Sequence, residues 1–397
     1  MRILLHDFPG HSFPVQLSRA LAARGHVVRH LTFADFPSPK GPLAPRENDP
    51  PTLTLATVAL PEPFEKYSFV KRWLQERRYA KALVADAEAF DPDVAIGGNA
   101  PLDVQNALQA WARRRGKGFV FWLQDVYGVA MTAILSRRLP LLGPVVAWWY
   151  RNLEYRLWRQ STVVVPITED FNPLLARCSV DPNRIVVVEN WANLDEAPVR
   201  PLENDWRAAH GLSGCRVFLY SGTLGLKHNP DLLADLARKF RDQPDVRVVV
   251  VSEGIGADRL IAAKAAESLD NLLILPFQPH AVLPDVIASG DVLVVLLEPD
   301  AGIYSVPSKT LTYLCAERAI LGSIPTANLA SRLIVKHQAG KVADPADQPG
   351  FLAAAAALMA DPDGRARMGE SGRAYAETHF AIDKIADRFE ALLKKSG

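Results

Sequence analysis

The chain has 397 residues, a length for which two domains of roughly 200 residues each are the natural expectation. Hydrophobic residues make up 49% and charged residues 22% of the sequence, which are values of globular proteins rather than of disordered ones. The formal net charge of +1 excludes an overall field that would draw the whole protein to nucleic acid or to a membrane, so any such contact must be local.

Cysteines and apolar stretches narrow the class further. Cys178, Cys215 and Cys315 are far apart and odd in number, which indicates neither a zinc site nor a disulfide framework and fits a reducing cytoplasm. The start, MRILLHDFPG, has too short an apolar part for a signal peptide. No charge-free apolar run is long enough to cross a bilayer. We therefore expect a cytoplasmic protein.

Apolar runs alternate with helical patterns, such as 15–24 and 103–115, through the first half of the chain. Most runs are continuous and rich in Val, Ile and Phe, as expected of strands covered by helices on both faces. This alternation predicts a parallel, doubly wound sheet. The predicted strands are 2–8, 27–33, 53–60, 94–99, 118–125, 162–168 and 184–190.

A polar stretch at 191–215 without a strand or helix pattern interrupts this alternation. A second series of alternating strands and helices follows, with predicted strands at 216–222, 245–254, 272–277, 291–299 and 319–323. The predicted fold class is α/β, with two Rossmann-like, doubly wound domains. We assign 1–195 to the N-terminal domain and 196–370 to the C-terminal domain. Residues 371–397 are predicted to be a C-terminal helix that packs back on the N-terminal domain.

Two strand ends of the first half carry candidate site residues. In the first turn, HDFPGHSFP, a dinucleotide-binding domain would have G-x-G-x-x-G, but only Gly10 is present, which argues against NAD or FAD. Gly10 and His11 either form an ordinary turn or lie at a helix start that faces a cleft between the two domains. Gln124 and Asp125 end the strand in VFWLQDVYG, where open α/β sheets bind ligands, although Asp125 could equally be a helix N-cap.

Three glycine-bearing strand ends in the second half agree with one another. SGTLGLKHNPD combines Gly222, Thr223 and Lys227, and Gly254 ends the next strand. Glycine permits close approach of the backbone, helix starts bind anions, and lysine adds a charge. The third end places Gly302, Ser305, Ser308 and Lys309 before and at the start of a helix. Each signal alone also fits a plain loop, but together they indicate a site for a nucleotide diphosphate.

Residues 141–160, LLGPVVAWWYRNLEYRLWRQ, mix tryptophan and tyrosine with arginine. This composition suits a lipid headgroup surface, and it also suits a core helix with a solvated basic face.

The order and spacing of these pieces resemble the family 4 glycosyltransferases of GT-B architecture, in particular the O-antigen and colanic-acid branch. The resemblance covers nearly the whole chain. It rests on ALAARGHVV (20–28), VVPITEDFNPLL (164–175), RIVVVENWAN (184–193), YSGTLGLKHNPDLL (220–233), SEGIGADRL (252–260), LPFQPHAVLPDVIASGDVLVVLL (275–297) and VPSKTLTYLCAERAIL (306–321).

The resemblance implies a retaining transferase whose two domains face a central cleft. A nucleoside-diphosphate sugar, by family habit a UDP-sugar, would bind the C-terminal domain, and a polyprenyl-diphosphate-linked glycan would bind on the side of Gly10 and His11. No metal or other cofactor and no nucleic acid is implied. The enzyme would lie at the inner face of the plasma membrane through 141–160.

Individual roles follow from the same resemblance. Lys227 and Lys309 would neutralise the diphosphate, and Gln124 and Asp125 would lie beside the transferred sugar. The residues expected to bind the donor are Gly222, Thr223, Gly254, Phe277, Gln278, Glu298, Gly302, Ser305, Ser308 and Thr312, with Phe277 and Gln278 placed where the main chain meets the base.

The sequence also departs from the family pattern. The family commonly has Gly-Arg at the positions of Gly222 and Thr223, so Thr223 stands in place of the arginine. The family's Glu-x7-Glu pair aligns with Tyr304 and Thr312, so neither glutamate is present, and Glu298 is nearby but out of register. The ribose contact is therefore unassigned. Two alternatives stay open: a nucleotide-sugar 2-epimerase, for which His280 is the evident candidate, and a sugar-nucleotide-binding protein without catalysis.

Overall fold

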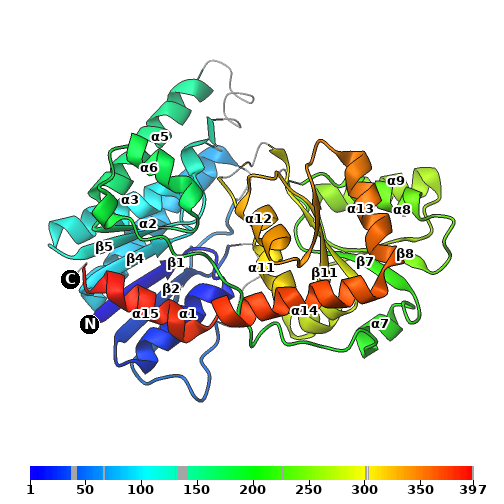
Figure 1. The fold of residues 1–397 in the computed structure, drawn as a ribbon. Helices are drawn as coiled ribbons and strands as arrows, with labels where there is room; N and C mark the ends of the chain where they lie inside the picture. The colour runs from blue at the N-terminus through cyan, green and yellow to red at the C-terminus, as the bar shows by residue number, and fades with distance from the viewer. Residues whose placement is uncertain are drawn as a thin grey trace. The chain divides into compact units, whose positions relative to one another are not determined.

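The structure is a computed structural model that describes residues 1–36, 43–65, 68–129, 131–132, 142–225, 228–299, 302 and 304–395. The chain forms two compact units (Figure 1): residues 1–190 with 382–397 make the first, and residues 191–381 make the second. The predicted boundary at 370/371 falls inside the helix Pro362–His379, and the chain leaves the second unit only at Ala381.

The first unit is built on a parallel six-stranded sheet of order β3-β2-β1-β4-β5-β6. Its central strands are buried along almost their whole length, which explains their continuous apolar sequences. The strands are β1 (Arg2–Asp7), β2 (Val27–Phe33), β3 (Leu53–Val58), β4 (Val94–Gly98), β5 (Gly118–Leu123) and β6 (Val163–Pro166). The helices are α1 (Ser12–Ala23), α2 (Phe69–Phe90), α3 (Leu102–Arg114), α5 (Gly143–Gln160), α6 (Asn172–Arg177) and α15 (Ile382–Leu393), with 3-10 turns at Glu169–Phe171 and Pro182–Arg184.

The last helix, α15, belongs to the first unit and lies beside α1 (Figure 1). Phe389 packs edge-on against Trp122 with ring centroids 5.0 Å apart. Arg24, just after α1, donates to Asp387 at 2.7 Å and to Glu390 at 3.0 Å. Apolar contact and charge pairing therefore both hold the end of the chain on this unit.

The second unit repeats the arrangement with a parallel sheet of order β12-β11-β10-β7-β8-β9. Its strands are β7 (Arg216–Ser221), β8 (Val246–Val251), β9 (Leu272–Leu275), β10 (Val292–Leu296), β11 (Ala319–Ser323) and β12 (Gly340–Ala343). Its helices are α7 (Asp205–Ala209), α8 (Asp231–Lys239), α9 (Ile255–Glu267), α10 (Leu283–Ala288), α11 (Ser308–Cys315), α12 (Leu329–Lys336), α13 (Gln348–Ala360) and α14 (Pro362–His379), with a 3-10 turn at His280–Val282. The predicted α/β class with two doubly wound domains is confirmed.

The predicted strand at 184–190 is wrong. Only Ile185 forms a bridge, with Val164, and the N–H groups of Val186 and Val188 donate to β6 at 3.0 Å. The return bond of a parallel ladder would have to come from the N–H of residue 166, which is proline and has none. The segment therefore runs along β6 without completing a strand. Conversely, β12, an edge strand of the second unit's sheet, was not predicted.

Candidate functional site

Lys309 is the central candidate in the second unit, because α11 places its ammonium against the turn that follows β7. Its Nζ lies 3.4 Å from the backbone oxygen of Thr223 and 4.8 Å from the ring centroid of Tyr220. Burial lowers the pKa of Lys309 to about 8. In the part of the chain that the structure describes, no carboxylate lies within ion-pair distance of this ammonium. A desolvated cation without an anionic partner suits an anionic ligand.

The backbone conformation at Gly222 favours glycine, and the absence of a side chain leaves room for Lys309. The φ of +125° at Gly222 is a conformation that side-chain-bearing residues avoid, and a Cβ there would lie 2.5 Å from Cε of Lys309. Two tyrosine hydroxyls stabilise the turn. The hydroxyl of Tyr220 donates to the backbone oxygen of Thr223 at 2.8 Å, and the hydroxyl of Tyr313 accepts from the N–H of Ser221 at 3.0 Å. The predicted residues Gly222, Thr223 and Lys309 therefore lie together.

The start of α9 comes close to the same turn. Gly254 is the N-cap of α9 with φ +89°, and a Cβ on Gly256 would lie 2.5 Å from Cβ of Leu224. The amino ends of α9 and α11 thus lie at the carboxyl edge of the sheet, next to the 221–225 turn. Their free N–H groups and dipoles add positive potential where Lys309 already provides a charge.

Asn328 holds the loop before α11, and the sequence reasoning missed it. Its buried Nδ2 donates to the oxygens of Gly302 at 2.7 Å and Ser305 at 2.8 Å, while its Oδ1 caps α12 at the Ala330 N–H. The only sequence signal was an Asn before a helical pattern. Ser308, the exposed first residue of α11, and the half-buried Thr312 lie on that helix, and Glu298 is half-buried after β10.

Phe277 and Gln278, the residues predicted to contact the nucleotide base, already form hydrogen bonds with other residues of the protein. The Phe277 N–H donates to Glu253 at 3.0 Å, and the Gln278 side chain accepts from the indole of Trp206 at 3.1 Å. The main chain of Gln278 stays the predicted contact with the base. Lys227, the second predicted cation, lies outside the described residues. His280 pairs with Glu196 at 3.8 Å.

In the first unit, a polar cluster lies at the carboxyl ends of β1 and β4. Asp7 is buried and accepts the His11 N–H at 2.5 Å and the Asn99 amide at 3.1 Å, and its Oδ1 is 3.5 Å from Nδ1 of His11. Burial works to raise the pKa of Asp7, but His11 holds it below its usual value. Burial works against a charged His11, but Asp7, with Asp125 adding, holds its pKa above the usual value.

This cluster shows what the first-turn prediction left out. Gly10 has φ +81°, and His11 is the N-cap of α1. That this turn faces a ligand stays a prediction. Asp7 and Asn99, which set the position and charge of His11, were not predicted, although both end apolar strands. Asn99 even takes a left-handed φ of 48°, a conformation that favours Asn over most residues.

Gln124 and Asp125 differ from each other in their surroundings. Gln124 is buried, and its Oε1 accepts from Asn190 at 2.5 Å, so it anchors the loop within the unit. Asp125 is half-buried and acts on the charge of His11. Glu154 of α5 accepts the N–H groups of the next residues, Tyr127 at 2.9 Å and Gly128 at 2.7 Å, and burial raises its pKa to about 8.

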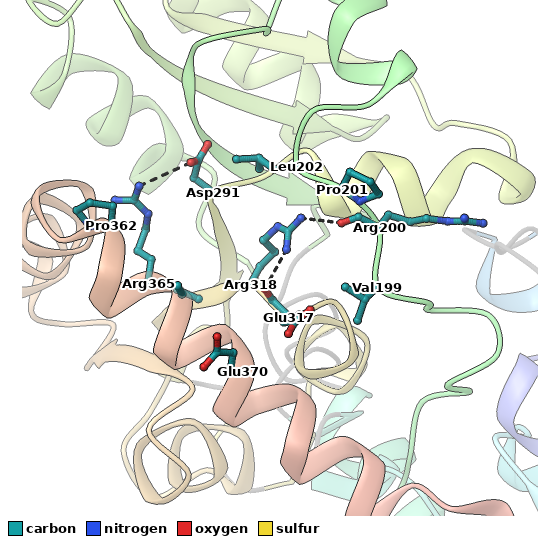
Figure 2. A pocket seen from close by; sticks show the side chains of 12 residues that line it. Val199, Arg200, Pro201, Leu202, Asp291, Glu317, Arg318, Pro362, Arg365 and Glu370 are labelled. Carbon is teal, nitrogen blue, oxygen red and sulfur yellow. Dashed lines mark hydrogen bonds and ion pairs between the residues drawn. The ribbon is translucent and has the colours of Figure 1, made fainter.

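A cavity of about 600 Å³ lies elsewhere, at the amino ends of β10 and β11 (Figure 2). Arginines that line this cavity form hydrogen bonds and ion pairs with other residues of the protein. Arg318 donates to the backbone oxygen of Arg200 at 2.8 Å, and Arg365 pairs with Asp291 at 3.7 Å. We assign these contacts to the joining of α14, the loop before α7 and the sheet. Across the described chain, no group of three or more His, Cys, Asp or Glu is arranged to hold a metal ion, and no described helix is long and apolar enough to span a membrane.

Comparison with known proteins agrees with this layout. A glycosyl transferase 4-like domain matches residues 13–191, and a glycosyl transferases group 1 domain matches residues 203–375. WcaI from Escherichia coli, provisionally named a colanic acid biosynthesis glycosyl transferase, is 29% identical over 99 residues, and the match spans 25% of this chain and 24% of that protein.

Solved structures share the fold over the full length. HepE from Anabaena, in complex with UDP, has a TM-score of 0.70 at 14% identity and covers 99% of this chain and 100% of its own. Sucrose-phosphate synthase from Thermosynechococcus elongatus has a TM-score of 0.74 at 16% identity and covers 100% and 98%. The two matched domains and the two Rossmann-like units place the chain among the glycosyltransferases of family 4, with GT-B architecture.

Proposed function

We propose that the protein is a retaining glycosyltransferase that moves a sugar from a nucleoside-diphosphate sugar, most simply a UDP-sugar, to a polyprenyl-diphosphate-linked glycan in cell-surface polysaccharide synthesis. The observation that carries the donor part is the desolvated Lys309, whose pKa burial lowers to about 8, next to the Gly222 turn. The UDP and UDP-glucose held by HepE support UDP as the first nucleotide to test.

The chemistry follows from where charge develops. Breaking the anomeric bond leaves negative charge on the diphosphate and positive charge on the sugar ring. Lys309 and the N–H groups at the start of α11 would stabilise the leaving diphosphate, without a metal. The acceptor hydroxyl would attack from the face that the diphosphate leaves, and the departing phosphate would take its proton. No protein nucleophile is needed.

The acceptor part rests on the cluster around His11. Nδ1 of His11 lies 3.5 Å from the buried Asp7, which raises the pKa of His11 and so favours a charged imidazolium at the carboxyl edge of the first sheet. A diphosphate-linked glycan carries complementary negative charge. Residues 141–160 would bring the enzyme to the inner face of the plasma membrane, where such an acceptor lies. The similarity to WcaI, limited to about a quarter of each chain, supports polysaccharide synthesis as the setting.

A thermal-shift panel with UDP, GDP, dTDP, ADP and NAD, in EDTA and in magnesium, tests the donor proposal. A ligand at 100 times its Kd adds about 2.7 kcal/mol of stability, which is a measurable change in Tm. A shift with one nucleoside diphosphate in EDTA supports the proposal and names the donor class. A shift with NAD alone, or with none of the ligands, refutes it. A nucleotide shift without any sugar transfer would instead favour a binding protein, and conversion of the donor sugar to its 2-epimer would favour an epimerase.

A further inference from the structure

Glu154 of α5 is a buried acid for which the proposed chemistry has no use. Its side chain is fully buried, and among the residues that the structure describes no basic side chain forms an ion pair with it. A buried carboxylate costs free energy unless its charge is compensated. Burial accordingly raises the pKa of Glu154 to about 8, and the nearby Asp125 acts in the same direction. An acid kept at such a cost indicates a role beyond packing.

The carboxylate of Glu154 caps the start of the helical segment that follows Asp125. Its Oε1 accepts the N–H of Tyr127 at 2.9 Å, and its Oε2 accepts the N–H of Gly128 at 2.7 Å. The chain becomes helical at Tyr127, so these N–H groups have no acceptor within the helix itself. Gly128 makes the approach possible, because a Cβ there would lie 2.8 Å from Oε2 and 3.1 Å from Cα of Arg151.

This contact takes over a task that Asp125 would otherwise have. An aspartate at a helix N-cap accepts the N–H groups two or three residues further on, which for Asp125 are those of Tyr127 and Gly128. Both of these groups donate to Glu154. The helix start therefore does not depend on the carboxylate of Asp125, which contributes instead to the raised pKa of His11 at the carboxyl edge of the sheet.

Asp125 also lies between two anchors of the same turn. On the side of β5, Gln124 accepts from the side chain of Asn190 at 2.5 Å. On the helical side, Glu154 binds the two N–H groups. We propose that Glu154 is a positioning residue for Asp125: by capping the helical segment and holding the turn, it leaves the carboxylate of Asp125 to the transferred sugar. The inference rests on the proposed function, which places Asp125 beside that sugar.

A double-mutant cycle on the rate of sugar transfer tests this role. Glu154→Gln keeps the shape of the side chain but removes its charge and turns an amide NH2 toward one of the two N–H groups. It is measured alone and together with Asp125→Ala, whose residual rate is followed over long incubations. Gly128→Ala obstructs the same contact from the side of the turn. Glu88→Gln is the control, since it removes an acid that joins α2 to α3 by accepting from Trp111 at 2.6 Å.

For every variant, kcat, the KM values for donor and acceptor, Tm and the UDP-induced shift in Tm are measured. Glu154→Gln and Gly128→Ala should each lower kcat by about 10- to 100-fold, because a misplacement of about 1 Å near the reacting atoms has that effect. Glu154→Gln should keep the donor KM and the UDP shift, and its Tm should be unchanged or higher, since a buried charge is removed. In the Asp125→Ala background it should change kcat by less than about twofold. Glu88→Gln should behave like the wild type.

Three results would overturn the inference. A loss of Tm in proportion to the loss of kcat, in both Glu154→Gln and Gly128→Ala, would show a merely structural role. An equal fall in kcat with and without Asp125 would show that Glu154 acts apart from it. A wild-type kcat in Glu154→Gln would refute the inference and leave the proposed function standing. A wild-type protein that binds UDP but transfers no sugar would instead refute the proposed function, and the inference with it.

Discussion

Replacing Lys309 with methionine should weaken nucleotide binding and stabilise the empty protein at the same time. The substitution removes the cation that we place at the donor diphosphate. A charge-assisted hydrogen bond to a ligand contributes roughly 1.5–3 kcal/mol, so the Kd for UDP should rise by about 10- to 150-fold. Methionine keeps the length and the apolar stem, so the packing against Gly222 is largely retained.

The expected stabilisation follows from the pKa of Lys309, which burial lowers from 10.5 to about 8. The shift corresponds to a cost of at most roughly 3 kcal/mol at neutral pH, reduced because the side chain is partly exposed. The unfolded chain binds more protons than the folded one between these two pKa values. The wild type should therefore gain unfolding free energy as the pH rises from about 8 to 10, and the variant should lack this gain.

Two assays separate these effects. Calorimetric titration gives the Kd for UDP at several pH values, and urea unfolding gives the stability of the empty protein. Wild-type affinity should fall above pH 8, as the ammonium loses its proton, while Lys309→Arg should keep its affinity there. Lys239→Met, at an exposed lysine of α8, is the control for loss of a charge. Unchanged UDP affinity in Lys309→Met, or a large loss of its stability, would refute the reasoning.

Three further substitutions test neighbouring parts of the account. Gly222→Ala should lower the unfolding free energy by roughly 1–3 kcal/mol and abolish the UDP-induced Tm shift, because its Cβ meets Lys309 in a left-handed conformation; a fully stable, nucleotide-binding variant would contradict this packing. Asn328→Ala should raise the KM for the donor more than it changes kcat, since it frees the loop before α11; an unchanged KM would show that the loop holds itself. Asp7→Asn should move the upper pH limit for acceptor use to lower pH, because the raised pKa of His11 depends on Asp7; the pH profile of the acceptor KM measures it, and an unmoved limit would exclude a charged His11 from acceptor binding.

The sequence predicted the parts of the fold that local patterns determine. Continuous apolar runs mark strands buried on both faces, and nearly all of those predicted are strands in the structure. The segment 184–190 has the same composition but pairs with Pro166, and the missing N–H of its partner could not be read from its own residues. The segment that became β12 is short and partly polar, and it is a strand only because β11 pairs with it.

The candidate site shows the same division between local and distant information. Gly222 and Lys309 were predicted because glycine and lysine at strand ends and helix starts have a direct chemical meaning. Asn99 and Asn328 were missed because each acts on residues that only the fold brings close, such as His11, 88 positions before Asn99. Asp7 lies only four positions before His11, and it was missed because it was read as part of the first strand. No pattern in the residues around Gln278 indicated that the indole N–H of Trp206 donates to its side chain.

The most direct measurement of the central claim is a transfer assay in EDTA with purified protein. Polyprenyl-diphosphate-linked glycans extracted from membranes serve as acceptors. The donors are nucleoside-diphosphate sugars that carry the nucleotide for which a thermal shift is found. We predict that mass spectrometry will find lipid-linked glycans heavier by one sugar, that the nucleoside diphosphate will be released in equal amount, and that the new bond will keep the anomeric configuration of the donor. Nucleotide binding without any sugar added to the lipid fraction would contradict the account.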